Sequence, residues 1–139
     1  MNGQYYNFDT FAQYANFTGE AFPDSPEFTA DFDGEYDWPV APDMTAFVGA
    51  NVNYASATSS FLTDDAASSQ YPASLLQIPS RTLLDLRAGV TKGPWRLQLW
   101  GHNVTNAYYW LSADHVNDVL VRYAGMPVTY GVLISYRFK

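Results

Sequence analysis

The sequence predicts an all-β fold, an antiparallel meander of about five or six strands. Apolar and polar residues alternate with a period of two in five separate segments, as they do on the two faces of a strand. Short and long connections alternate between these segments. Helical signals are poor, because no stretch of about a dozen residues places apolar side chains at the 3.6-residue spacing of an amphipathic helix.

The first two predicted strands are the most regular in the N-terminal half. Segment 28–38, FTADFDGEYDW, alternates aromatic or small residues with Thr and four carboxylates. Segment 45–54, TAFVGANVNY, places Ala, Val and Tyr on one face and Thr, Phe, Gly and Asn on the other. A weaker candidate lies near Tyr5–Tyr14, where the pattern is too irregular to define a strand.

Three further strands are predicted from Arg81 onward. Segments 81–91, RTLLDLRAGVT, and 95–104, WRLQLWGHNV, alternate Leu, Ala, Val and Trp with Asp, Arg, Gln and His. Segment 128–138, VTYGVLISYRF, has six large apolar residues on one face and Thr, Gly, Leu, Ser and Arg on the other. Each segment therefore has one face without charge.

The connections differ in length in a regular way. The turns at 39–43, PVAPD, and 92–94, KGP, are short and contain proline. The segments 56–79 and 105–125 are predicted to be long loops. Short turns at one end of a sheet and long loops at the other are typical of outer-membrane barrels, whose short turns are periplasmic and whose long loops are extracellular.

Composition limits the classes of function. The chain has 139 residues, 47% hydrophobic and 17% aromatic, and it contains no cysteine, which excludes disulfides and thiolate metal sites. A net charge of −7 argues against a nucleic acid partner. The charge is uneven: residues 1–80 hold eleven Asp or Glu and no Lys or Arg, whereas all seven basic residues lie at or after Arg81. The two halves are predicted to meet each other or a third element.

A lipid bilayer and a protein core both produce alternation, but three features favour lipid. Strands of about ten residues at about 45° tilt cross roughly 23 Å, the height of an outer-membrane apolar band. Trp38 and Trp95 flank the short turns, and Tyr54 and Tyr130 lie towards the long loops, as in interfacial aromatic girdles. The apolar positions carry no charge. The alternative is a soluble, aromatic-rich β-sandwich binding module, for example one that binds carbohydrate.

Three stretches carry a resemblance to a known family. These are LLDLRAGVTKGPWRLQLWGHNVTNAYYW at 83–110, RYAGMPVTYGVLISYRF at 122–138 and, more loosely, SPEFTADFDGEYDW at 25–38. Together they resemble the C-terminal β-barrel segment of TonB-dependent outer-membrane receptors. The sequence departs from that pattern at Lys139, which follows the terminal aromatic Phe138, and at Pro127–Val128, where the family commonly has Pro followed by Arg.

The resemblance implies that residues 1–139 are the C-terminal portion of a receptor barrel, an open fragment of a roughly 22-stranded barrel in the bacterial outer membrane. The plug domain, TonB box and signal peptide are expected to lie outside residues 1–139. Such receptors import siderophores, cobalamin, carbohydrates or other scarce nutrients. The implied partners are outer-membrane lipid, the plug and remaining strands, the TonB system indirectly and the barrel assembly machinery. An unclosed sheet has open edges that invite aggregation.

Candidate site residues fall into three groups. Polar residues on the charged strand faces are predicted to line a hydrated lumen and to face the plug. Among them, the row of carboxylates at 31–37 is predicted to pair with basic residues of the plug and not to bind a metal ion. These are Asp31, Asp33, Glu35, Asp37, Asp85, Arg87, Arg96, Gln98, His102 and Arg137. Asp114, His115 and Asp118 are candidate extracellular ligand contacts, and Tyr136 and Phe138 resemble the barrel assembly signal.

No enzyme motif is present. The sequence contains no phosphate-binding loop, no HExxH motif and no Ser-His-Asp order. No cofactor and no metal are therefore expected, and the chain is not expected to be an enzyme.

Overall fold

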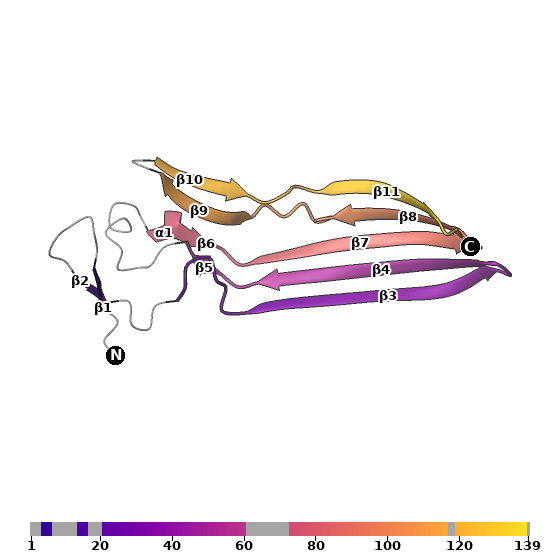
Figure 1. The fold of residues 1–139 in the computed structure, drawn as a ribbon, viewed down its shortest axis with the longest axis horizontal. Coiled ribbons are helices and arrows are strands. Elements are labelled where there is room, and N and C mark those ends of the chain that lie inside the picture. Colours follow the sequence, from indigo (N-terminus) through magenta and orange to yellow (C-terminus); the bar gives the residue numbers. More distant parts are fainter. Residues whose placement is uncertain (1–3, 7–13, 17–20, 61–72, 117–118, 139) are drawn as a thin grey trace. The chain divides into compact units, whose positions relative to one another are not determined.

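The structure is a computed structural model that describes residues 4–6, 14–16, 21–60, 73–116 and 119–138 (Figure 1). The chain divides into two compact units, which we call the sheet unit and the loop unit. The sheet unit comprises Thr29–Ala55, Arg81–Tyr108 and Met126–Lys139. The loop unit comprises Met1–Phe28, Ser56–Ser80 and Tyr109–Gly125.

The sheet unit contains one antiparallel sheet of five strands in the order β11-β8-β7-β4-β3 (Figure 1). The strands are β3 (Thr29–Ala41), β4 (Met44–Ala55), β7 (Arg81–Lys92), β8 (Trp95–His102) and β11 (Thr129–Tyr136). Each strand pairs with its neighbour along the chain in this sheet, so the predicted antiparallel meander of five strands is confirmed. The sheet is open, with β3 and β11 as its edges.

Two short turns lie at one end of the sheet. Gly93 and Pro94 connect β7 to β8, and the positive φ of Gly93 (55°) suits the first position of a two-residue hairpin turn. The other turn is tighter than the predicted 39–43, because β3 continues to Ala41. Pro39 pairs with Thr45 and a register shift follows before Ala41. Proline is tolerated here because β3 is an edge strand.

The register aligns the apolar positions of all five strands on one surface, the apolar face. Tyr36, Val48, Ala88, Leu99 and Val132 form one continuous row across the sheet. The large side chains of the apolar face are exposed: Leu99 retains 57% of its surface, Val132 61% and Ile134 65%. A sheet packed inside a soluble sandwich would bury these side chains.

The loop unit contains a hairpin within one of the predicted long loops. Residues 105–125 were predicted to be a long loop, and within this segment β9 (Trp110–Val116) pairs with β10 (Val119–Ala124) as an antiparallel hairpin that was not predicted from the sequence. The alternation in WLSADHV is too weakly apolar to identify a strand from sequence.

Segment 56–79 also contains short elements where it is described. They are β5 (Thr58–Ser59), the one-turn helix α1 (Ala73–Leu76) and β6 (Gln77–Ile78), with β5 pairing to β6. Near the N-terminus, β1 (Gln4–Tyr6) pairs with β2 (Tyr14–Asn16), at the position of the weak sixth candidate. No helix within the described ranges is long and apolar enough to cross a membrane.

The loop unit is held by a buried hydroxyl. The Ser60 hydroxyl donates to Oδ1 of Asp24 at 2.8 Å and accepts the backbone N–H of Ala113 at 2.9 Å. The Ser60 N–H also donates to the carbonyl of Leu76 at 3.0 Å, and the side chains of Leu76 and Ile78 are buried, at 5% and 2% exposure. One serine thus joins three segments that lie far apart in the chain, which satisfies polar groups that burial would otherwise penalise.

Candidate functional site

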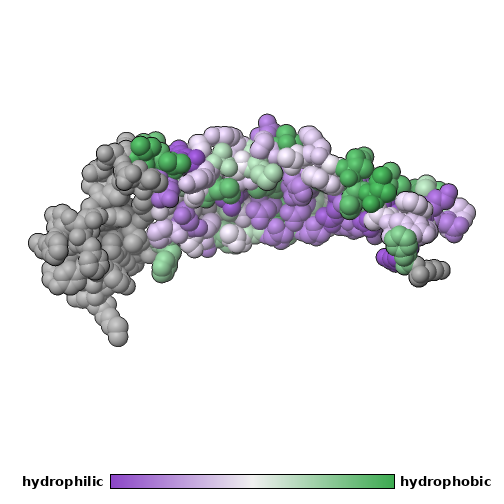
Figure 2. Space-filling model, turned by 45° about the horizontal axis from the view of Figure 1, so that its top comes forward, coloured by the Kyte–Doolittle hydropathy of each residue, from purple (hydrophilic) through white to green (hydrophobic). Residues whose placement is uncertain are grey.

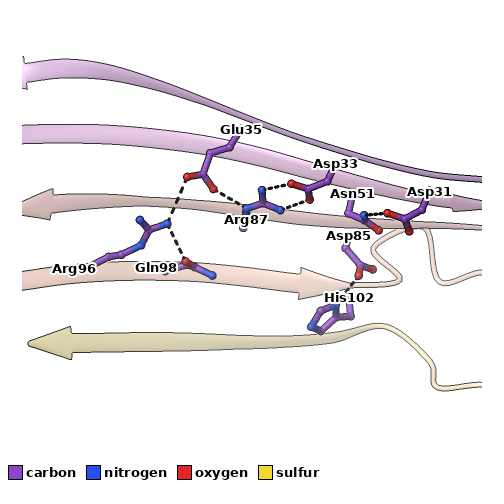
Figure 3. A network of polar contacts seen from close by, with 9 residues as sticks. All are labelled: Asp31, Asp33, Glu35, Asn51, Asp85, Arg87, Arg96, Gln98 and His102. Carbon is purple, nitrogen blue, oxygen red and sulfur yellow. Dashed lines mark hydrogen bonds and ion pairs between the residues drawn. The ribbon is translucent and has the colours of Figure 1, made fainter.

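The candidate site is the polar face, the surface of the five-stranded sheet opposite the apolar face. Eight of the ten predicted polar-face residues lie on it with a partner on the same face, and Asn51 is one of those partners (Figure 3). The alternation of β3, β4, β7 and β8 places them there, because every second residue of a strand points to the same side. Their position on one face was predicted from sequence, but their partners were not.

Arg87 on β7 is the centre of these contacts. Its Nη1 and Nη2 donate to the two carboxylate oxygens of Asp33 at 2.7 and 2.8 Å, and its Nε donates to Oε2 of Glu35 at 2.7 Å. The guanidinium fork matches the Asp33 carboxylate in a bidentate geometry, which is the strongest form of this pairing. A basic residue of the C-terminal half therefore pairs with two carboxylates of the acidic ladder of the N-terminal half.

This bridge spans an intervening strand. Glu35, Gly49 and Arg87 form one row across β3, β4 and β7. A Cβ atom added at Gly49 would lie 2.6 Å from Nε and 3.0 Å from Cγ of Arg87. The absence of a side chain at Gly49 therefore gives the Arg87 side chain its path across β4 to the carboxylates of β3.

Arg96 on β8 extends the contacts toward the short turns. Its guanidinium carbon lies 3.8 Å from the centroid of the Phe47 ring, a cation–π geometry. Its Nη2 is 3.7 Å from Oε1 of Glu35 and donates to Oε1 of Gln98 at 3.4 Å. Phe47 is only 2% exposed although it lies on the polar face, because Arg96 covers its ring.

The other end of the polar face is organised by amides. Oδ1 of Asp31 accepts Nδ2 of Asn51 at 2.9 Å, and its Oδ2 accepts Nδ2 of Asn53 at 3.2 Å. On β7, Oδ2 of Asp85 lies 2.7 Å from Nδ1 of His102. These carboxylates are held by neutral or weakly basic groups rather than by arginine.

A hollow of about 370 Å³ lies between these groups. Its side-chain lining includes Trp100, whose ring centroid is 4.8 Å from that of His102. The remaining polar lining is Asn51, Asp85, Arg87, Gln98 and His102. Hydrogen-bonding groups around an aromatic ring give this part of the sheet the composition of a small-molecule contact surface.

Two predicted polar-face residues lie outside the contacts. Asp37 is exposed and, among the residues that the structure describes, has no hydrogen-bonding or ionic partner. Arg137 follows β11 and lines a second hollow of about 400 Å³ with Arg96 and Ser135 near the Gly93–Pro94 turn. Its backbone N–H donates to the carbonyl of Pro94 at 2.9 Å, which ties the end of the chain to that turn.

The chemistry available on the polar face is charge pairing and hydrogen bonding. The described part of the chain contains no group of three or more His, Cys, Asp or Glu side chains that could hold a metal ion. The carboxylates of β3 are spaced along a straight strand, whereas a calcium site gathers its ligands around one point.

The candidate extracellular contacts are only partly described. Asp114 and His115 lie in β9, and the Asp114 side chain is exposed. Asp118 lies outside the described residues. The grouping of these three residues around a ligand remains a prediction.

The aromatic residues at the end of β11 form a small cluster at the short-turn end of the sheet. The ring of Tyr136 lies 4.8 Å from that of Trp95 and 4.8 Å from that of Phe138, both edge-on. Phe138 remains 85% exposed. Tyr36 and Trp38 stack at 5.7 Å on β3, so aromatic pairs mark both edges of the sheet. The assembly role of Tyr136 and Phe138 remains a prediction.

Two residues that organise the polar face, Gly49 and Phe47, were not predicted from the sequence. Gly49 and Phe47 carry no signal of their own, because their importance comes from side chains that cross from neighbouring strands. Figure 2 shows hydrophilic residues gathered along the middle of the sheet unit on the visible side, with an apolar group toward the short turns.

Comparisons with known proteins agree with this architecture. The family model described as "TonB dependent receptor-like, beta-barrel" matches residues 1–104. One solved structure, that of BauA, the ferric preacinetobactin receptor from Acinetobacter baumannii, is similar with 26% sequence identity and a TM-score of 0.61. The match covers 85% of this chain and 16% of that receptor. The search of curated proteins found no match.

The family match, the open antiparallel sheet and the two unlike faces agree with one another. The chain belongs to the TonB-dependent receptor β-barrel family of the bacterial outer membrane.

Proposed function

We propose that this chain forms part of the barrel wall, with its outward-facing loops, of a TonB-dependent receptor that imports a scarce nutrient. The observation that carries the proposal is the apolar face, whose large side chains are exposed across all five strands while the opposite face is charged. Lipid is the solvent that makes such a face stable. The soluble β-sandwich alternative is not favoured, since it would cover this face with a second sheet.

The chain corresponds in this proposal to the C-terminal portion of the barrel, residues 1–139. Support comes from β11, an edge strand that leads into the aromatic residues Tyr136 and Phe138. The proposed partners are a plug domain and further barrel strands, and the edges of β3 and β11 would pair with those strands. The TonB system would act through the plug, and the barrel assembly machinery would recognise the terminal aromatic strand.

The imported nutrient is proposed to be a ferric siderophore, with cobalamin and carbohydrate as the other classes. The support is the 26% identity to a ferric siderophore receptor. The test is uptake by cells that carry the complete receptor and by cells that lack it, with a ferric catecholate, a ferric hydroxamate, cyanocobalamin and a maltooligosaccharide as probes. Receptor-dependent uptake of an iron complex alone supports the proposal, and uptake of only cobalamin or sugar overturns the siderophore assignment.

The polar face is proposed to line the lumen and to face the plug. Support comes from its incomplete internal neutralisation: Arg87 and Arg96 pair with Asp33 and Glu35, while Asp37 has no ionic partner among the described residues. A photo-crosslinking residue at Gln98 in the complete receptor should attach to the plug, and one at Leu97 should not. Plug attachment from Leu97 instead of Gln98 would reverse the assignment of the two faces.

The topology gives an independent test on intact cells. The turns near 39–43 and 92–94 are proposed to be periplasmic, and the segments 56–79 and 105–125 extracellular. Cysteine at Ser68, which lies outside the described residues, should react with an impermeant reagent. Cysteine at Lys92 should react only after the outer membrane is opened. Labelling of Lys92→Cys but not Ser68→Cys on intact cells would contradict this orientation.

A further inference from the structure

The chain leaves the sheet after β8 through two asparagines in a backbone conformation that other residues avoid. Asn103 and Asn106 both have φ of 49°, in the left-handed region. Asparagine is one of the few residues with a side chain that enters this region at low cost. Asn103 is also only 4% exposed, which is unusual for a polar residue at the end of a strand.

The Asn103 side chain joins both ends of the segment that carries hairpin β9–β10. Its Nδ2 donates to the carbonyl of Ala107 at 2.9 Å and to the carbonyl of Met126 at 3.0 Å. Its Oδ1 accepts the backbone N–H of Ala107 at 2.9 Å. Ala107 precedes the hairpin and Met126 follows it, so one amide holds the entry and the exit of the segment together.

Asn106 adds a second connection of the same kind. Its Oδ1 accepts the backbone N–H of Val128 at 3.2 Å, and its own N–H donates to the carbonyl of Asn103 at 2.8 Å. The N–H of Val104 donates to the carbonyl of Leu84 at 2.8 Å, which anchors the turn to β7. The entry turn and the exit strand are therefore linked twice, through side chains.

The third attachment is Asp85 on the polar face. Its Oδ1 accepts the backbone N–H of Asn103 at 2.9 Å, while its Oδ2 lies beside His102. The Asp85 carboxylate thus contacts His102 on the polar face and the backbone of Asn103, just before segment 107–126. Asp85 also lines the 370 Å³ hollow, so a molecule bound there would lie next to this attachment.

We propose that Asn103 and Asn106, anchored by Asp85, are positioning residues that clamp the two ends of segment 107–126. The clamp holds the entry and exit of hairpin β9–β10 at a fixed separation, so that the hairpin bearing the candidate ligand contacts is a preformed element rather than a free loop. This assignment deepens the proposed import function and rests on it. The clamp itself is a structural claim that can be tested without the nutrient.

The test is hydrogen exchange on the purified complete receptor, read by mass spectrometry over residues 107–128. Asn103→Gly and Asn106→Gly keep the positive φ and remove the amide contacts. Asn103→Gly should exchange about tenfold faster at the N–H of Ala107, and Asn106→Gly about tenfold faster at the N–H of Val128, because each variant loses the amide oxygen that accepts that N–H. Asn106→Asp keeps an oxygen acceptor for Val128 and should exchange like the wild type at that position. Thr105→Ala, at an exposed position of the same turn, is the control.

Two results would overturn the clamp. One is unchanged exchange at Ala107 and Val128 in both glycine variants. The other is an equal acceleration throughout β7 and β8, which would mean that the substitutions loosen the whole sheet. Uptake by the unmodified complete receptor separates the two proposals: if it imports none of the probes, the import function is refuted and the exchange result still stands.

Discussion

The two faces of the five-stranded sheet use the same backbone for opposite kinds of stability. On the apolar face, Leu97, Leu99, Val132 and Ile134 project outward and are 42–65% exposed. On the polar face, side chains reach across strands and bind one another, as Arg87 does with Asp33 and Glu35. The apolar side chains are stabilised by the medium that surrounds them, whereas the polar side chains are stabilised largely by ion pairs and hydrogen bonds with one another.

The difference shows why an alternating sequence can be ambiguous. Alternation fixes only that two faces differ, because successive residues point to opposite sides. Whether the apolar side meets a core or lipid depends on what covers it, and on this sheet the large apolar side chains remain uncovered. Substitutions that exchange the character of one face for the other are therefore the sharpest way to test the comparison.

The largest effect is expected from placing a charge on the apolar face. Leu97→Arg and Val132→Arg should each lower the free energy of unfolding in vesicles by about 2–4 kcal/mol if the sites lie near the bilayer midplane. Gln98→Arg and Ser135→Arg, one residue further along the same strands, are the matched controls and should be tolerated. Equal sensitivity at both pairs of positions would remove the distinction between the faces.

The next effect concerns the glycines of the two faces. A Cβ at Gly89 would lie 2.1 Å from the Leu97 carbonyl oxygen and 2.6 Å from the Phe47 ring, whereas nothing lies within 4 Å of a Cβ at Gly34. Gly89→Ala should destabilise the complete receptor by about 1–3 kcal/mol, the cost of overpacking. Gly34→Ala should change its stability by less than about 0.5 kcal/mol. Chemical unfolding checks both, and similar losses at the two sites would contradict the packing on the polar face.

The smallest effect tests the Arg87 bridge. Salt screens exposed ion pairs, so the stability of the wild type should fall as NaCl is raised. Arg87→Met should reduce this dependence, and Gly49→Leu should reduce it to the same extent by filling the path of the arginine side chain. The double variant should be no more affected than either single variant. Additive losses of salt dependence would show that Gly49 acts independently of Arg87.

Much of the fold was predictable from sequence because strand alternation is a local property. All five main strands, the Gly93–Pro94 turn and the shared face of Asp33, Glu35, Arg87 and Gln98 follow from residue spacing alone. Hairpin β9–β10 was missed because WLSADHV lacks a clean alternation, and its pairing depends on a second strand, Val119–Ala124. The extension of β3 past Pro39 was missed because proline usually ends a strand, except at a sheet edge.

By itself, the sequence determined that this protein has antiparallel strands with one charge-free face, because apolar and polar residues alternate with a period of two along each strand. Only the tertiary structure decided which residues meet. Arg87 crosses Gly49, and Arg96 covers the ring of Phe47, so both contacts join residues of different strands. The hydrogen bond from Asn103 to Met126 joins the two ends of a long segment. Such contacts depend on register and on the space that neighbours leave, and neither is encoded in the spacing of residues along one strand.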